Sequence, residues 1–189
     1  MALQRGVFWI SERGLDLPLC AALTAELRAL AAASRLHGAG VGRAASHRRD
    51  TGLRGDRIAW LTSATPSQRQ LLKSLERLRV ALNRTLYLGI SGIEAHFANY
   101  PPGARYARHV DSFVGASNRV ISLVTYLNAD WRHDDGGELV LYASDAAREL
   151  ARVEPRAGTV VVFLSEEVPH EVMPATRPRD SIAAWFRRP

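Results

Sequence analysis

From residue 91 onward the sequence has the pattern of successive short β-strands, and this feature most limits the folds open to the chain. Val, Ile, Tyr, Phe and Trp gather in short segments bounded by turn-forming residues. The segments span residues 91–100, 107–111, 119–127, 138–142, 159–164, 170–173 and 181–187. A meander of this kind predicts a double-sheet jelly roll, or cupin-like barrel.

Two helical patterns precede these strands. Asp16 is the expected N-cap of a helix that continues through Leu30, and Thr65 precedes a second helix that continues to Leu86. We therefore predict the α+β class, a double-stranded β-helix with the N-terminal helices packed on one sheet.

A length of 189 residues fits one domain with a substantial core. Residues 1–90 are expected to supply helical support and a lid loop, and residues 91–189 the jelly-roll core. The loop at residues 37–56 is rich in glycine and arginine. A lid over a binding site and a plain solvated connection both agree with its composition, and its length favours the lid.

A His-x-Asp pair occurs at His109 and Asp111, inside one expected strand. Side chains two apart in an extended segment point to the same face, so the pair offers two metal ligands together. His170, in another expected strand, can supply the third. Two histidines and one carboxylate leave positions open at iron, as in non-haem iron oxygenases.

Arg179 follows nine residues after His170. Its guanidinium can bind a carboxylate in a bidentate manner, although a surface charge would also suit its sequence context. A second His-x-Asp pair, His133 and Asp135, directly precedes two glycines. We give it less weight because a turn holds metal geometry less precisely than a strand.

The composition adds few constraints. The net charge of +6 favours an acidic partner without identifying it. The single cysteine, Cys20, lies in an apolar helical pattern and is expected to be a buried thiol. No signal-like or membrane-spanning run is visible, so we expect a cytoplasmic protein with no membrane association.

Together these motifs resemble the 2-oxoglutarate-dependent prolyl 4-hydroxylases, above all the hypoxia-inducible-factor prolyl hydroxylases and their bacterial counterparts. The resemblance covers most of the chain from residue 40 onward. It rests on Tyr100-Pro, Tyr106-x-Arg-His109-x-Asp111, Tyr126-Leu-Asn-x-Asp-Trp131, Gly136-Gly137, Pro169-His170-Glu-Val, Arg179 with Trp185, and Leu53-Arg-Gly-Asp-Arg-Ile-Ala-Trp60.

The resemblance implies Fe(II), 2-oxoglutarate and O2 as cofactor and co-substrates, with ascorbate as an auxiliary cofactor. It assigns Fe(II) to His109, Asp111 and His170, and the far carboxylate of 2-oxoglutarate to Arg179 with Tyr126. Tyr100 is expected near the chelating end of the co-substrate.

The expected substrate contacts are Arg54, Asp56, Arg119 and Trp185, with an ion pair between Asp56 and Arg119. Trp185 would also suit a core position. Ala183 departs from the animal enzymes, which carry threonine there, and the segment from Tyr100 to His109 is one residue shorter than theirs.

The implied activity is C4 hydroxylation of an exposed prolyl residue in a protein, with release of succinate and CO2. Among bacterial relatives the resemblance points to elongation factor Tu as the substrate. Alternatives are free proline, a small peptide or another protein. Nucleic-acid demethylation is not expected, because Trp185 stands where those oxygenases carry a second arginine. A non-catalytic cupin-like binding module is the remaining alternative.

Overall fold

The computed structural model describes residues 6–40, 52–112, 118–145 and 147–189. The central part of the predicted 37–56 lid therefore lies outside the described residues. The elements are β1 (Phe8–Ser11), α1 (Leu17–Ala32), β2 (His37–Gly38), β3 (Arg57–Trp60), α2 (Pro66–Leu86), β4 (Gly92–Tyr100), β5 (Tyr106–His109), β6 (Arg119–Tyr126), the 3-10 helix η3 (His133–Asp135), β7 (Leu139–Tyr142), β8 (Glu149–Val153), β9 (Val160–Leu164), β10 (His170–Val172) and β11 (Arg179–Arg187).

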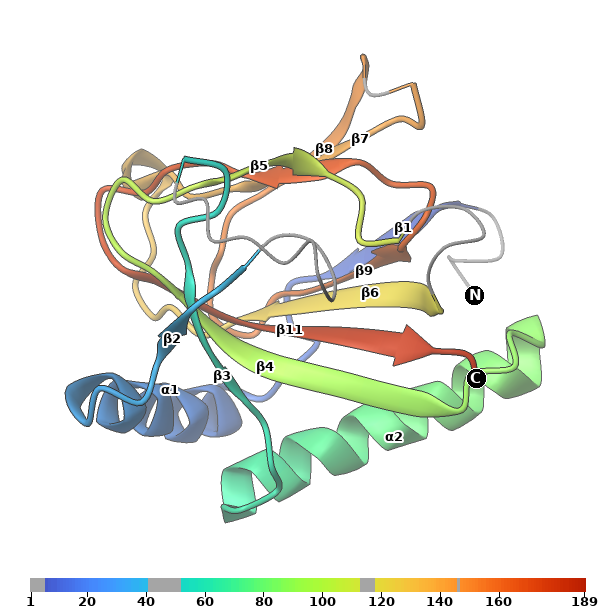
Figure 1. Ribbon diagram of the computed structural model, residues 1–189, viewed down its shortest axis with the longest axis horizontal. Helices are drawn as coiled ribbons and strands as arrows, with labels where there is room; N and C mark the ends of the chain where they lie inside the picture. Colours follow the sequence, from blue (N-terminus) through green and yellow to red (C-terminus); the bar gives the residue numbers. More distant parts are fainter. Residues whose placement is uncertain (1–5, 41–51, 113–117, 146) are drawn as a thin grey trace.

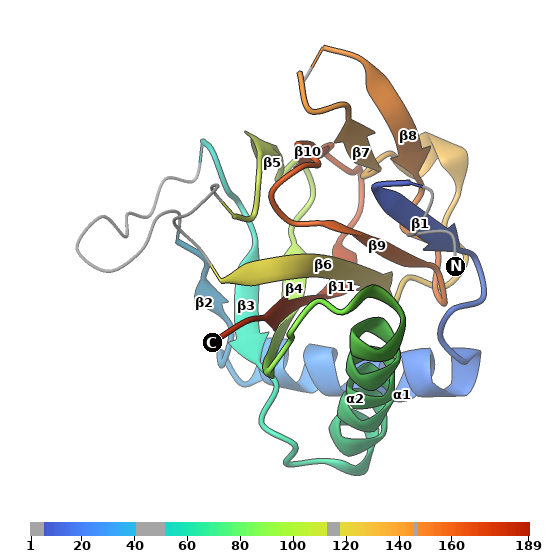
Figure 2. The same cartoon turned by 90° about the vertical axis from the view of Figure 1, so that its right-hand side faces the viewer.

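The strands form two sheets, which confirms the predicted double-stranded β-helix. The larger sheet has the order β1-β9-β6-β11-β4-β3-β2, and the smaller one the order β5-β10-β7-β8. All strand pairs within these sheets are antiparallel. Both helices lie against the outer face of the larger sheet, and the smaller sheet lies on its other side (Figures 1 and 2).

The two helices begin where the sequence predicts. Asp16 is the N-cap of α1, and the Thr65 hydroxyl accepts a hydrogen bond from the Gln68 backbone N–H at the start of α2. Each helix also has a proline in its first turn, where no intrahelical N–H is needed. Among the described residues, no helix combines the length and apolar character needed to cross a membrane.

The larger sheet separates two apolar clusters. Leucines of both helices pack with one set of strand residues, which includes Phe97, Ile182 and Phe186. The alternate strand residues, such as Tyr100 and Phe163, pack between the two sheets. Because side chains alternate along a strand, each long strand contributes to the helical core with one set and to the interior of the barrel with the other.

The structure corrects the strand predictions at three places. The strand predicted at residues 107–111 ends at His109, so Asp111 lies beyond it. β2 lies within the segment predicted as a loop, and a strand of two residues is too short to produce a sequence pattern. β8 is not predicted, because Glu-Leu-Ala-Arg-Val has little of the β-branched and aromatic character typical of strands.

Candidate active site

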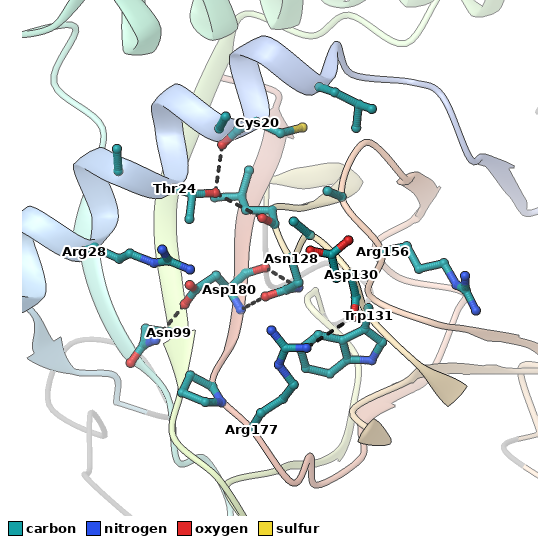
Figure 3. Close-up of a pocket in the computed structure, with 17 residues that line it drawn as sticks. Cys20, Thr24, Arg28, Asn99, Asn128, Asp130, Trp131, Arg156, Arg177 and Asp180 are labelled. Carbon is teal, nitrogen blue, oxygen red and sulfur yellow. Dashed lines mark hydrogen bonds between the residues drawn. The ribbon is translucent and has the colours of Figure 1, made fainter. Parts of the chain in front are cut away.

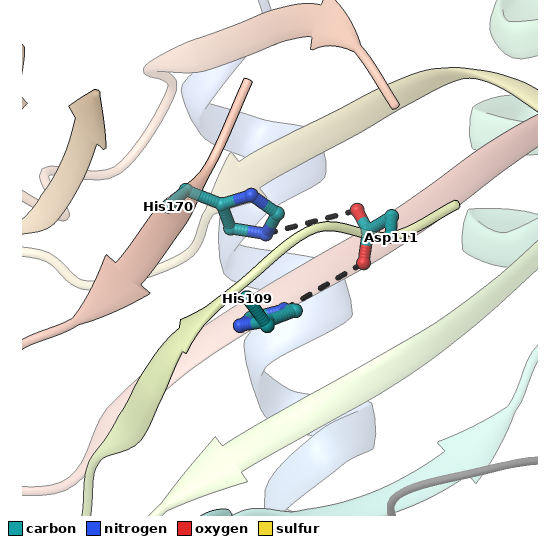
Figure 4. A group of neighbouring side chains, drawn as sticks. All are labelled: His109, Asp111 and His170. Atoms are coloured by element: carbon teal, nitrogen blue, oxygen red, sulfur yellow. Dashed lines mark ion pairs between the residues drawn. The ribbon is translucent and has the colours of Figure 1, made fainter. Parts of the chain in front are cut away.

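Three potential metal ligands converge between the two sheets (Figure 4). His109 ends β5 and pairs directly with His170 at the start of β10, and Asp111 follows two residues after His109. The Nε2 atoms of His109 and His170 each lie 3.7 Å from a carboxylate oxygen of Asp111. One potential ligand atom from each residue falls within 4.8 Å of the others, which suits a single metal ion.

Backbone carbonyls determine which ring nitrogen of each histidine can bind a metal. Nδ1 of His109 lies 2.8 Å from the Ala107 oxygen, and Nδ1 of His170 lies 3.0 Å from the Val168 oxygen. A carbonyl oxygen can only accept, so both Nδ1 atoms must carry the proton. The Nε2 lone pairs are then available to a metal, as in metal sites where the outer N–H of a ligand histidine is bonded to a carbonyl.

The charge states of the cluster also suit a cation. Burial raises the pKa of the Asp111 carboxyl, but His170, His109 and a 2.6 Å hydrogen bond from Ser122 outweigh burial and hold that pKa below its usual range. Burial, helped by the nearby His109, lowers the pKa of His170 to about 4. Asp111 is therefore an anion and His170 a neutral ligand at physiological pH.

Arg179 lines the same pocket and is only 1% exposed. Its Nε donates to the Gly137 carbonyl at 2.7 Å, and one terminal nitrogen donates to the Ser181 hydroxyl at 3.4 Å. The other terminal nitrogen is buried and has no partner in the described part of the chain. An unpaired buried guanidinium N–H is costly, so this geometry fits an anion that completes its hydrogen bonds.

Two tyrosines flank this guanidinium. The rings of Tyr100 and Tyr126 each lie 5.1 Å from its central carbon. The Tyr126 hydroxyl is buried and, within the described ranges, has no hydrogen-bond partner. Burial raises the pKa of Tyr126 to about 12, so the hydroxyl keeps its proton and can donate to an anion beside Arg179.

The predicted substrate contacts form two separate groups, and Arg119 is the one of them that does not line the pocket. Arg54 binds both carboxylate oxygens of Asp56, at 2.6 and 2.9 Å. Arg119 pairs instead with Glu94 at 2.6 Å and lies over the Trp185 ring at 3.8 Å. The predicted ion pair between Asp56 and Arg119 is therefore wrong in this structure, because each has a nearer partner of opposite charge.

The structure also shows where Trp185 and the second His-x-Asp pair lie. Trp185 is buried and also lines the pocket, so the core position and the pocket position do not exclude each other. His133 lies in the 3-10 helix η3, where its ring is exposed and pairs with Glu154 at 2.8 Å. It is far more exposed than the histidines of the metal cluster.

The sequence does not predict the site roles of three further residues, although the Gly136-Gly137 motif is visible in it. Ser122 positions the Asp111 carboxylate, Gly137 supplies the carbonyl that anchors Arg179, and His96 lines the pocket. Period-two alternation from Tyr100 would have placed His96 on the same strand face. No comparable signal marks Ser122, because its role depends on a partner from another element.

A second concave surface lies outside this pocket (Figure 3). It has a volume of about 1060 Å³ and runs between α1 and the loop that follows β6. None of the predicted site residues lines it. Polar groups at this surface have partners within the protein: the half-buried Asn99 donates to Asp180, and Asn128 donates to the backbone carbonyls of Pro155 and Asp180. We assign it no catalytic role.

Residues 95–187 match the family described as the 2OG-Fe(II) oxygenase superfamily. A solved prolyl-4-hydroxylase from Pseudomonas putida is 42% identical, with a TM-score of 0.90 over 98% of this chain and 95% of that one. A Trichoplax adhaerens prolyl hydroxylase, solved with a hypoxia-inducible-factor peptide fragment, is 26% identical, with a TM-score of 0.86 over 98% and 85% of the two chains.

The hypoxia-inducible factor prolyl hydroxylase of Caenorhabditis elegans is 40% identical over 95 residues, which are 49% of this chain and 13% of that protein. The chain spans between 13% and 59% of the length of the curated relatives it matches here. Given the pocket geometry and these matches, the chain belongs to the 2OG-Fe(II) oxygenase superfamily. Within that superfamily it is similar to prolyl hydroxylases over nearly its whole length.

Proposed function

We propose that this protein is a 2-oxoglutarate- and Fe(II)-dependent dioxygenase that hydroxylates C4 of a prolyl residue in a protein, with release of succinate and CO2. The observation that carries the proposal is one pocket that holds both the His109, Asp111 and His170 cluster and the incompletely bonded guanidinium of Arg179. A metal site alone would fit many activities. The buried guanidinium of Arg179 beside it adds the requirement for an anionic co-substrate.

His109, Asp111 and His170 are the proposed Fe(II) ligands. Ferrous iron there would supply oxygen activation coupled to decarboxylation of 2-oxoglutarate. Because the protein provides only three ligands, O2 and 2-oxoglutarate could both bind. The chain fixes the direction of the two imidazoles through their carbonyl partners, and the direction of the carboxylate through Ser122.

Arg179, Tyr126 and Tyr100 are the proposed co-substrate residues. The free terminal N–H of Arg179 and the Tyr126 hydroxyl offer two donors to the far carboxylate of 2-oxoglutarate. On the resemblance, we assign Tyr100 to the chelating end of 2-oxoglutarate, and its ring centroid also lies 5.1 Å from the central carbon of the guanidinium. All three side chains are buried, which strengthens their polar contacts.

Arg54, Asp56, Arg119 and Trp185 are the proposed substrate contacts; Arg119 adjoins the pocket through its contact with the Trp185 ring, and the other three line it. Their charged groups are paired within the protein, so they offer a shaped surface with little excess charge in the described residues. A lid formed by residues 37–56 would close over this surface and orient the substrate. Ascorbate belongs to the proposal only as an auxiliary reductant.

Elongation factor Tu is the substrate that we propose, on the basis of the resemblance to bacterial relatives. The net charge of +6 suits an acidic protein partner. The solved Trichoplax relative, which holds a peptide fragment, supports a protein rather than a nucleic acid as the substrate class. Free proline, a small peptide and another protein are the alternatives that the experiment must separate.

The test is mass spectrometry after incubation with Fe(II), 2-oxoglutarate and O2. Purified elongation factor Tu, free proline and proteins captured by an inactive His109→Ala variant are offered in parallel. We expect one added oxygen atom on a prolyl residue, with equimolar succinate. The control variant is His133→Ala, which alters the surface His-x-Asp pair and should keep full activity.

The outcomes separate the hypotheses. Oxygen added to proline in another captured protein would show that the captured protein, and not elongation factor Tu, is the substrate, and the proposed activity would stand. Oxygen added only to free proline would show that the substrate is the amino acid and not a protein. Absence of both modified proline and succinate from the wild-type protein would refute the dioxygenase proposal and favour a binding module.

A further inference from the structure

His96 lies inside the proposed catalytic pocket and has no role in the proposed chemistry. It belongs to β4 and is only 2% exposed, yet it lines the same cavity as the metal cluster. Its ring lies between two tryptophans, with centroids 5.1 Å from Trp60 and 5.2 Å from Trp185. These two aromatic contacts help to fix the position of the ring in the pocket.

The hydrogen-bonding state of His96 follows from its neighbours. Nδ1 lies 3.0 Å from the Phe97 carbonyl oxygen, which can only accept, so Nδ1 carries a proton. Burial lowers the pKa of His96 to about 4, and the positive charges of Arg54 and Arg119 act in the same direction against the opposing charge of Asp56. The ring is then neutral at physiological pH, and Nε2 has a lone pair and no proton.

Among the described residues, the hydrogen bond at Nδ1 is the one that the His96 ring forms. Nε2 is not one of the described buried polar atoms that lack a partner, so this atom is open to the pocket that His96 lines. A donor on a molecule that enters the pocket can therefore replace water at Nε2.

The strand register shows where His96 lies relative to the metal cluster. Ala183 of β11 pairs with His96 on one side and with Val124 of β6 on the other. Ser122, which bonds to Asp111, is two residues from Val124 on the same face of β6. Adjacent strands of a sheet lie about 4.8 Å apart, so His96 lies roughly 10 Å across the sheet from Val124.

The small side chain of Ala183 leaves space between the two sides of the pocket. A target residue held near the metal cluster would lie over Ala183, with its neighbouring backbone toward His96. Proline itself has no backbone N–H, so a prolyl target cannot supply the donor from its own peptide nitrogen. The nearest donors are the N–H groups of the residues before and after it.

We propose that His96 is a substrate-recognition residue whose Nε2 accepts a hydrogen bond from a peptide N–H flanking the target proline. This inference rests on the proposed prolyl hydroxylase function and extends it to sequence selection. If the neighbouring residue that donates to His96 were itself a proline, it would have no N–H to donate. Target prolines with a second proline at that neighbouring position should therefore be poor substrates.

The experiment is a cycle of two enzyme variants and N-methylated peptides. The parent peptide spans the proline that the wild-type protein hydroxylates, and two analogues carry an N-methyl group on the residue before or after it. His96→Leu removes the acceptor at similar volume, and His96→Gln restores an acceptor through its carbonyl. Peptide dissociation constants are measured by fluorescence anisotropy, and KM values for peptide and 2-oxoglutarate by succinate release.

We expect His96→Leu to weaken binding of the parent peptide about tenfold, the effect of losing one hydrogen bond with a buried partner. The KM for 2-oxoglutarate and the iron content should stay unchanged. His96→Gln should recover most of the affinity. For the parent peptide, the dissociation constant of His96→Leu should be about ten times that of the wild-type protein. For one of the two N-methyl peptides, the two dissociation constants should be about equal.

His133→Leu is the matched control, because this histidine is exposed and lies outside the pocket. Equal peptide affinity of His96→Leu and the wild-type protein would overturn the inference alone. The inference would also be overturned if the dissociation constants of His96→Leu and the wild-type protein still differed tenfold with both N-methyl peptides. If the wild-type protein hydroxylates no proline in any substrate, the proposed function fails and this inference fails with it.

Discussion

Replacement of Arg179 by methionine should make the protein insensitive to 2-oxoglutarate without destabilising it. The guanidinium is buried, and among the described residues no carboxylate forms an ion pair with it. One of its terminal nitrogens has no partner there. A charge in such a position opposes folding until an anion binds, so the ligand-free Arg179→Met variant should be at least as stable as the wild-type protein.

The magnitude follows from the charged hydrogen bonds that methionine cannot donate to the ligand. A hydrogen bond that involves a charged group contributes about 1.5–3 kcal/mol, so removal of the guanidinium should weaken 2-oxoglutarate binding roughly 100-fold. At a concentration 100 times the wild-type dissociation constant, the ligand stabilises the wild-type protein by about 2.7 kcal/mol and the variant by only about 0.4 kcal/mol. For a domain of this size these values correspond to shifts in Tm of about 5–10 °C and about 1 °C.

The assay is thermal unfolding with and without 2-oxoglutarate, in the presence of constant Mn(II) and without oxygen, so that no turnover occurs. Arg177→Met is the control, because Arg177 is partly exposed and its ring contact is with Trp131 outside the catalytic pocket. This control should keep the full shift in Tm.

A wild-type-sized shift in Arg179→Met would refute the anion clamp. A large loss of stability in the ligand-free variant would refute the argument that the guanidinium is uncompensated. The two results are independent, because one concerns the ligand and the other the free protein.

Three further predictions concern neighbouring positions. Ser122→Ala removes the 2.6 Å hydrogen bond to Asp111 and should weaken metal binding about 10- to 100-fold, as measured by titration with Mn(II). Gly137→Ala should lower the free energy of unfolding by more than about 1 kcal/mol, because Gly137 has φ +74° and an added Cβ would lie 3.2 Å from Cδ of Arg179. His96 should make the protein less stable in acid: its folded pKa of about 4 is below the unfolded value of 6.5, so the unfolded state binds more protons between these values. The free energy of unfolding should therefore fall with decreasing pH from 6.5 to 4, by up to about 3 kcal/mol, and this part of the pH dependence should be absent in His96→Leu.

Each of these predictions has a contrary outcome. Unchanged Mn(II) affinity in Ser122→Ala would mean that Asp111 is positioned without the hydroxyl. A stable Gly137→Ala variant with normal 2-oxoglutarate affinity would show that the turn can relax. Identical pH profiles of unfolding in the wild-type protein and His96→Leu would show that His96 is protonated equally in both states.

The architecture could be predicted from the sequence because the relevant signals are local. The alternation of apolar residues after residue 91 predicts the strands, and the caps at Asp16 and Thr65 predict the helix starts. Ligand chemistry predicts the grouping of His109, Asp111 and His170, although His170 is distant in sequence. That prediction depends on the requirement of a metal for several ligands at once.

The ion pairs are less predictable because they depend on competition among many charges. Arg119 is expected from the resemblance to pair with Asp56, but Glu94 lies nearer to it, and Asp56 is already bound by Arg54. A strongly charged sequence offers several partners to each arginine. Only the strand register determines which of them is adjacent.

The division of β11 into two sets of residues affects how this chain can change in evolution. Arg179, Ser181, Ala183 and Trp185 line the pocket, whereas Ile182, Ala184 and Phe186 belong to the core beneath the helices. Individual substitutions at Ser181 or Ala183 would change the lining of the pocket and leave the core residues untouched. Insertion or deletion of a single residue would exchange the two sets, so selection should preserve the length of this segment even where it permits its composition to drift.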